Sequence, residues 1–187
     1  MTFTRLAAGC LIFGIASFIA NQTNAFPISD KDDLRVLAGQ SMGQIKLGEG
    51  EEAVMAALGK ADRGDASLGR LQLCWMVKPS AEGNRKAGLD VFFRRDDSGH
   101  HYVVTEIRAS SPDFKTSEGV SPQSSLKTLR DHYPTLQRLE VRWADSSTVI
   151  YDSVNTGIAF EMDDEEKCSA IIVHKPGIAV VAMEPLR

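Results

Sequence analysis

Apolar and polar residues alternate along this chain in two segments that share one order of predicted elements. In the first segment, Val54, Ala57 and Leu58 form an apolar stripe at helical spacing, and acidic residues precede it. Gly59 stands where a helix ends. Strand-like runs follow at Leu71–Val77 and through a hairpin from Leu89 to Arg108. The pattern predicts one short helix followed by antiparallel strands.

The second segment opens with helix-start residues at Ser121–Ser125, and an apolar stripe of Leu126, Leu129 and Tyr133 ends at Pro134. Short apolar runs separated by turn residues come next, which predicts another meander. The predicted strands are Leu139–Trp143, Thr148–Tyr151, Gly157–Met162 and Cys168–His174, with a further edge strand at Ile178–Met183.

The two segments together predict an α+β fold of two tandem helix-plus-antiparallel-meander repeats. We expect a continuous or paired antiparallel sheet with the helices on one face, because two copies bury a core that one copy lacks. The chain then divides into a signal peptide (1–25), an N-terminal lead-in (26–43), the first repeat (44–112) and the second repeat (113–187). The second repeat includes a C-terminal strand, and the parts after the signal peptide form one compact domain.

The N-terminus resembles a secretory signal peptide. Arg5 precedes an apolar run from Leu6 to Ala20, and Thr23 and Ala25 are the small residues that a signal peptidase accepts. A span of a bilayer needs roughly 20 apolar residues, so this run is short for a retained anchor. We expect a soluble mature chain that begins at Phe26 in the periplasm or outside the cell.

The charge balance limits the partners of the chain. The 187 residues hold 21 Lys and Arg against 25 Asp and Glu, a formal net charge of −4. Nucleic acids and anionic membranes favour basic surfaces. We therefore expect neither as the main partner, and no membrane span after signal cleavage.

Two cysteines, Cys74 and Cys168, remain after the predicted cleavage. In an exported protein, an even number of cysteines favours a disulfide, here one that joins the two predicted repeats. The alternative is a pair of buried free thiols. A redox pair is disfavoured because the chain has no Cys-x-x-Cys.

Glycines at helix starts and a set of core positions resemble small bacterial envelope proteins. The matching residues are Ile45–Gly48, Glu52–Val54, Ala57–Gly59, Phe114–Thr116, Gly119, Val120, Ser124–Leu126, Tyr133 and Pro134. The arrangement is similar to beta-lactamase-inhibitory-protein-like folds and to the outer-membrane assembly lipoproteins. This resemblance implies a fold and not an activity, since no target-contacting residue of the inhibitor matches a position here.

Catalytic motifs of the common enzyme classes are missing from the sequence. No Gly-x-Ser-x-Gly, phosphate loop, dinucleotide fingerprint or His-Glu-x-x-His occurs. The alternative is a small hydrolase or metal-dependent enzyme whose site is assembled from scattered residues. Its candidates are His100 and His101 with Asp96 and Asp97, although adjacent strand residues point to opposite faces. We predict no metal, no cofactor and no catalytic residue.

Exposed aromatic residues on short polar strands are typical of binding surfaces. Trp143 and Tyr151 are such candidates, with Arg142 beside Trp143, and core packing is the alternative for both rings. Loops near 78–88 and 144–147 would border the same surface. We predict an exported, non-enzymatic module of the bacterial envelope that binds another envelope or extracellular protein, as an inhibitor or an assembly factor. The oligomeric state does not follow from the sequence.

Overall fold

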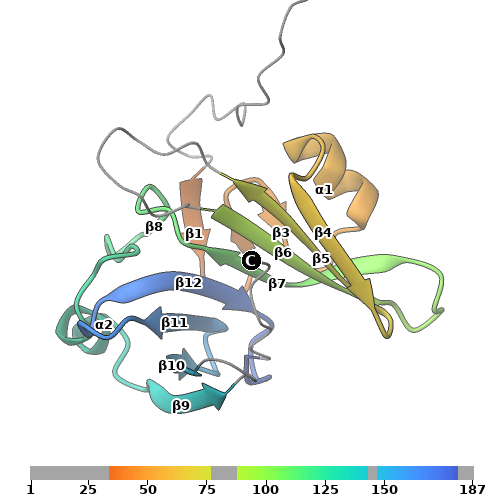
Figure 1. Ribbon diagram of the computed structural model, residues 1–187. Coiled ribbons are helices and arrows are strands. Elements are labelled where there is room, and N and C mark those ends of the chain that lie inside the picture. The colour runs from red at the N-terminus through yellow and green to blue at the C-terminus, as the bar shows by residue number, and fades with distance from the viewer. Residues whose placement is uncertain (1–33, 77–87, 143–146, 181–187) are drawn as a thin grey trace, which may run out of the picture.

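About half of the described chain is β-strand, and little of it is helix. The computed structural model describes residues 34–76, 88–142 and 147–180, and these form a large antiparallel sheet, a small sheet and two short helices (Figure 1). The strands of the large sheet, in spatial order, are β4 (Arg63–Ser67), β5 (Arg70–Met76), β6 (Gly88–Arg95), β7 (Tyr102–Ala109), β12 (Cys168–His174), β11 (Ile158–Met162), β10 (Ser147–Ser153) and β9 (Gln137–Arg142).

The centre of the large sheet joins strands that are far apart in the sequence. Strand β7 pairs antiparallel with β12, and Ile107 lies opposite Val173. The two open edges, β4 and β9, consequently belong to different halves of the chain. Figure 1 shows β4 to β7 on one side of this junction and β9 to β12 on the other.

The small sheet covers part of the large one and is built from very short strands. Its order is β3 (Ile45–Lys46), β2 (Ser41–Met42), β1 (Arg35–Leu37) and β8 (Lys115–Thr116), with β1 and β8 parallel. A close backbone approach ties this layer to the large sheet, since the Gly39 N–H donates to the Gly157 carbonyl at 3.0 Å. A Cβ on Gly157 would meet the His174 carbonyl and Gly39, so only glycine fits there.

Both helices are two turns long and end where their sequences predict. Helix α1 (Glu51–Leu58) ends at Gly59, which has a positive φ of 76°. Helix α2 (Leu126–His132) begins after Ser125, whose side chain accepts a hydrogen bond from the Thr128 amide at 3.2 Å.

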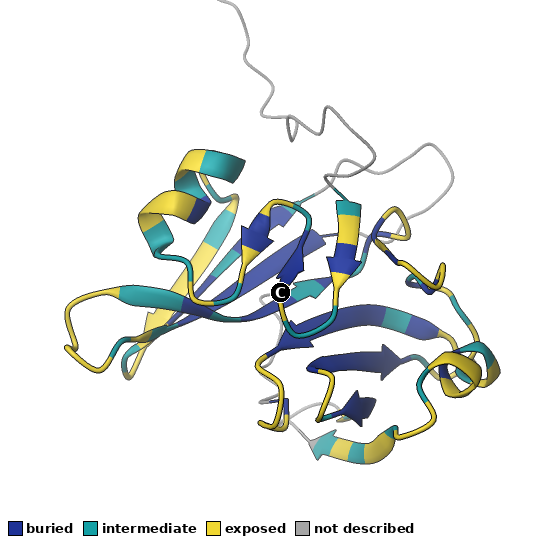
Figure 2. Cartoon of the chain, turned by 180° about the vertical axis from the view of Figure 1, so that it is seen from behind, coloured by how far each residue is buried: buried dark blue, intermediate teal, exposed yellow. Residues whose placement is uncertain are grey.

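The hydrophobic core lies on one face of the large sheet. Leu89, Val91 and Phe93 of β6 point into it, as do alternate residues of the neighbouring strands. The small sheet closes this core with Val36 and Met42. Figure 2 shows the buried strands in the middle of the molecule and exposed residues on the outer side of α1 and in the loops.

The predicted fold class of two helix-plus-meander repeats is wrong. The described chain is mostly β, 49% strand and 12% helix, around one eight-stranded sheet. Each helix buries a single side chain, Val54 in α1 and Leu129 in α2, so the helices are too small to form a layer. The small sheet supplies the missing cover, and the sequence showed little sign of it because its strands have two or three residues each.

Individual elements were predicted more accurately than the class. Both helices and the strands β5, β6, β7, β9, β10, β11 and β12 lie within a few residues of their predicted positions. Strands β4, β2, β3 and β8 were not predicted. Strand β1 lies in the predicted lead-in of residues 26–43, for which the sequence left a short helix or a strand open. The proposed edge strand at Ile178–Met183 is not seen in residues 178–180, and its remainder lies outside the described residues.

Candidate functional site

The face of the large sheet opposite the core carries most of the buried charge. Cross-strand pairing places Cys74, Asp90 and Arg108 in one row, followed by Ile172. We call this surface the polar face. Its buried polar residues are Gln72, Asp90, Glu106, Asp152, Glu161 and His174, and Arg108 lies among them.

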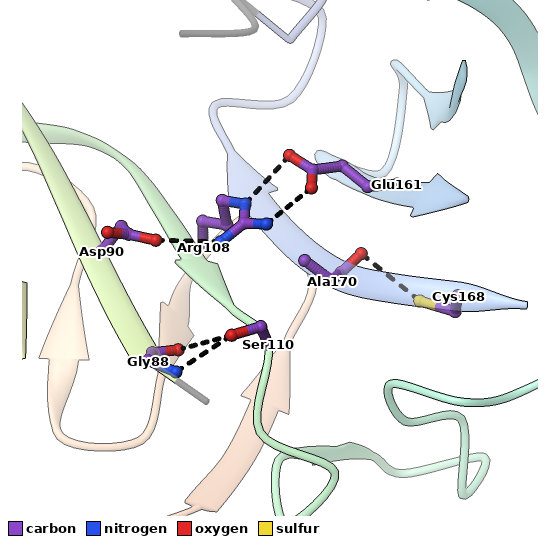
Figure 3. A network of polar contacts seen from close by, with 7 residues as sticks. All are labelled: Gly88, Asp90, Arg108, Ser110, Glu161, Cys168 and Ala170. Atoms are coloured by element: carbon purple, nitrogen blue, oxygen red, sulfur yellow. Dashed lines mark hydrogen bonds and ion pairs between the residues drawn. The ribbon is translucent and has the colours of Figure 1, made fainter. Parts of the chain in front are cut away.

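Arg108 is the centre of an ion network on the polar face. Its Nη1 lies 2.9 Å from Asp90 Oδ2, and its Nε and Nη2 donate to both oxygens of Glu161 at 2.9 and 2.7 Å. The Arg108 side chain crosses β12, in which Ala170 is the cross-strand partner of Glu161 (Figure 3). A fork on both carboxylate oxygens is the strongest geometry available to arginine.

Burial and the neighbouring carboxylates act in opposite directions on the pKa of Arg108. Burial favours the neutral form of Arg108, but Glu161 and then Asp90 outweigh that effect, so the pKa of Arg108 is raised above its ordinary value. The network therefore holds strands β6, β7 and β11 together.

A second buried pair links the polar face to the C-terminal segment. Asp152 Oδ1 lies 3.0 Å from His174 Nε2, and Asp152 Oδ2 accepts from the Val180 amide at 2.9 Å. His174 Nδ1 lies 3.2 Å from the Lys175 carbonyl. A carboxylate and a carbonyl only accept hydrogen bonds, so both ring nitrogens must carry protons.

The environment of His174 agrees with that protonation. Burial disfavours the imidazolium, but the hydrogen bond and charge of Asp152, the Lys175 carbonyl and the Glu106 charge together raise the pKa of His174. The imidazolium and Asp152 form an ion pair in which both side chains are almost fully buried. This pair fixes residues 174–180 against β10.

The predicted disulfide is absent, because Cys74 and Cys168 are both free and buried. Strands β6 and β7 lie between β5 and β12, so the two cysteines are more than about 14 Å apart at ordinary strand spacing, because Cys168 also lies four residues along β12 from the row of Cys74. A disulfide needs Cα atoms about 4.4 to 6.8 Å apart. Burial raises the pKa of each thiol to about 12, with Asp90 adding to the effect at Cys74 and Glu161 at Cys168. The alternative of two buried free thiols describes the structure.

The β4–β5 turn presents the most exposed large apolar side chain of the described residues. Leu68 is 99% exposed, and its φ is 50°, in the left-handed region that a leucine rarely adopts. Gly69 follows with a φ of 74°, so both turn residues have the positive φ of a type I′ turn. Asparagine and glycine are the residues that such a turn favours, and leucine is strained there.

The aromatic residues proposed as a binding surface are not brought together by the described structure. Tyr151 is only 8% exposed, and its ring packs in the core with the Arg130 guanidinium 5.5 Å from the ring centre. That position matches the core-packing alternative. Arg142 ends strand β9, and its side chain lies outside the described part, as do Trp143 and most of the loops near 78–88 and 144–147.

The histidine and aspartate cluster lies in the β6–β7 turn. Asp96 accepts from the Ser98 hydroxyl at 2.6 Å and from the His101 amide at 3.4 Å, which lowers its pKa. Asp97 and both histidines are exposed. No group of three metal-ligating side chains occurs among the residues that the structure describes.

The sequence holds only a weak signal for the β4–β5 turn. Ser67-Leu68-Gly69-Arg70 contains a glycine between two strand-forming runs, yet leucine is an unusual first residue for such a turn. The buried network left no signal, because Asp90, Arg108 and Glu161 are 18 and 53 residues apart.

Comparison with known proteins gives no family and no curated relative, since no family model and no curated protein matches the chain. Two solved structures are similar to it. The uncharacterized protein yfeY from Escherichia coli is 16% identical, with a TM-score of 0.47 over 74% of this chain and 99% of that one. A DUF4309 family protein, YjgB from Bacillus subtilis subsp. subtilis str. 168, is 12% identical, with a TM-score of 0.44 over 73% of this chain and 88% of that one.

At these identities and TM-scores, neither similarity defines a function. The resemblance to beta-lactamase-inhibitory proteins and assembly lipoproteins stays a prediction. Among the described residues, neither helix has the length and apolar character that crossing a membrane requires.

Proposed function

We propose that this chain is an exported, non-enzymatic module of the bacterial envelope that binds another protein, and that the β4–β5 turn is part of its contact surface. The sequence of residues 1–25 supports export. The observation that carries the binding proposal is Leu68, an apolar side chain held fully in solvent by a strained backbone.

The strain at Leu68 is informative because stability of the fold alone would favour a different residue at this position. An asparagine at position 68 would relieve the left-handed conformation and remove the exposed apolar surface. Single exposed leucines are common on protein surfaces, so exposure by itself means little. Exposure together with strain is typical of a residue that serves recognition rather than stability.

The surroundings of the turn suit a contact with another protein. Strand β4 is an open edge of the sheet, and Gly64, Asp65, Ala66 and Ser67 are all exposed. Open edges accept partners through main-chain hydrogen bonds, and a protruding leucine adds an apolar anchor.

The test is affinity capture from envelope extracts of the native host with the mature chain as bait. A Leu68→Asn bait keeps the turn geometry and removes the apolar contact. An Ile178→Asn bait is the matched control, because Ile178 is exposed but lies at the opposite end of the chain. We expect one stoichiometric protein to be retained by the parent and the control and lost by Leu68→Asn. Equal retention by all three baits would contradict the proposal.

A further inference from the structure

Two arginines face each other next to the β4–β5 turn. Arg70 of β5 and Arg94 of β6 are direct cross-strand partners, so their side chains leave the same face of the sheet about 5 Å apart at their Cβ atoms. Like charges in this arrangement destabilise a sheet. In the region described, neither guanidinium has an ion pair or a hydrogen bond.

The next pair on the same face adds an unpaired donor. Gln72 lies opposite Phe92, and both are buried, at 8% and 2% exposed. Gln72 Nε2 is the one buried side-chain nitrogen or oxygen of the described residues that has no hydrogen-bond partner. A buried donor left unsatisfied is costly and rare in folded proteins.

The charges on the flanking strands do not satisfy these donors. Asp65 of β4 lies across from Gln72, and Glu106 of β7 lies across from Phe92. Asp65 is exposed, and Glu106 has other interactions, among them the charge of His174. Arg70 is exposed and Arg94 is half-buried, and the Gln72 amide that is buried beside them has no acceptor among the described residues.

We propose that Arg70 and Arg94 bind the carboxylates of an acidic peptide segment, and that this segment belongs to the protein that contacts Leu68. The inference rests on the proposed function. Guanidinium groups match carboxylates through paired hydrogen bonds. Two guanidiniums on neighbouring strands match two carboxylates of one peptide, and a single inorganic anion does not supply both.

Adjacent residues of β6 provide a matched pair of variants. Arg94 lies on the polar face, whereas Arg95 lies on the other face, stacked 4.9 Å from the centre of the Tyr102 ring and bonded to the Gly99 carbonyl. Arg94→Gln removes a proposed ligand, and Arg95→Gln removes the same net charge at the same end of the sheet. Because Arg94→Gln also removes the repulsion, it is expected to raise Tm slightly, which shows that the variant folds.

The probe is a fluorescent hexaglutamate peptide, with hexaglutamine and inorganic phosphate as comparison ligands, added to the mature chain and followed by anisotropy and amide NMR shifts. We expect hexaglutamate to shift the amide signals of residues 70–72 and 92–94. Arg94→Gln should lower the affinity for hexaglutamate about tenfold, as loss of a charged hydrogen bond does. Arg95→Gln should change the affinity for hexaglutamate little. Hexaglutamine should bind the parent chain weakly.

Three results would overturn the inference: no shift with hexaglutamate, an equal loss of affinity in both arginine variants, or phosphate binding as tightly at the same residues. Each leaves the capture experiment with Leu68→Asn unaffected. A partner that depends on Leu68 but carries no acidic segment would therefore refute the inference and keep the proposed function.

Discussion

Arg108 reaches across an entire strand to hold Glu161. The side chain leaves β7, crosses β12 and meets both carboxylate oxygens of Glu161 on β11, at 2.9 and 2.7 Å. The same group bonds Asp90 on β6. One side chain thus joins strands from both halves of the chain at the centre of the large sheet.

Replacing Arg108 with methionine should destabilise the protein strongly. The substitution keeps the aliphatic stem but leaves Asp90 and Glu161 buried without a cation, and breaking such a network costs about 3–5 kcal/mol. The free energy of unfolding in urea measures the effect. Arg138→Met is the control, since Arg138 is exposed and lies 3.8 Å from Glu140 in a surface ion pair. A loss below about 1 kcal/mol for Arg108→Met would mean that the network contributes little.

Enlarging Ala170 should also weaken the fold. Ala170 is fully buried and is the cross-strand partner of Glu161 in the strand that Arg108 crosses, so a leucine there would crowd the ion network. Overpacking of this kind costs about 1–3 kcal/mol, and separating the ion pair adds to it. Urea unfolding of Ala170→Leu tests this, with Ala170→Ser expected near the parent. Parental stability of Ala170→Leu would show that the arginine has another route to Glu161.

The sequence predicted local elements well and long-range relationships poorly. Glycine and proline stops placed both helices, and alternation placed β6 and β7, because these signals act within a few residues. The pairing of β7 with β12 joins residues such as Ile107 and Val173, whose contact depends on the whole chain. The apolar stripe around Val54 predicted a helix but not that this helix would bury one residue only.

The candidate site was harder to predict for the same reason. Tyr151 looked like a surface aromatic because polar residues surround it in sequence, yet the pleat turns it into the core. The disulfide was predicted from the number of cysteines, and the sequence does not show that two strands separate Cys74 from Cys168. Leu68 had no periodic pattern around it, and its importance rests on a backbone angle that the sequence does not display.

The ion pair of His174 and Asp152 should make stability depend on pH. The pKa of His174 is higher in the folded state than the ordinary value of about 6.5, so the folded state binds the proton more tightly. The stabilisation is fully present below about pH 6.5 and is lost as the pH rises through the raised pKa of the folded state. Urea unfolding between pH 5 and pH 9 measures this decline.

The variant His174→Gln separates this effect from other titrating groups. It should lose about 1.5–3 kcal/mol at pH 5, the range for hydrogen bonds to charged groups, and should differ less from the parent at pH 9. If the free energy of unfolding of the parent increased relative to that of His174→Gln as the pH rises, a charged, buried His174 would be contradicted.

Cys74 and Cys168 should remain reduced and unreactive. Both thiols are buried with pKa values raised to about 12, so very little thiolate exists at pH 8. We expect iodoacetamide to label neither residue in a native chain of residues 26–187 and both in urea, as read by intact mass. Rapid labelling of the native protein would contradict the burial of the thiols. A mass lower by two hydrogens in protein purified without reductant would show a disulfide and would contradict free thiols.

Site-specific photo-crosslinking at position 68 tests the central claim most directly. A photoreactive amino acid replaces Leu68 in the exported chain in its native host, and the same residue at position 178 serves as the control for exposed apolar positions. The account predicts one dominant crosslinked protein from position 68, located outside the cytoplasm and absent from position 178. Identical crosslinks from both positions, or none from position 68 in a folded and exported chain, would contradict a binding role for the β4–β5 turn.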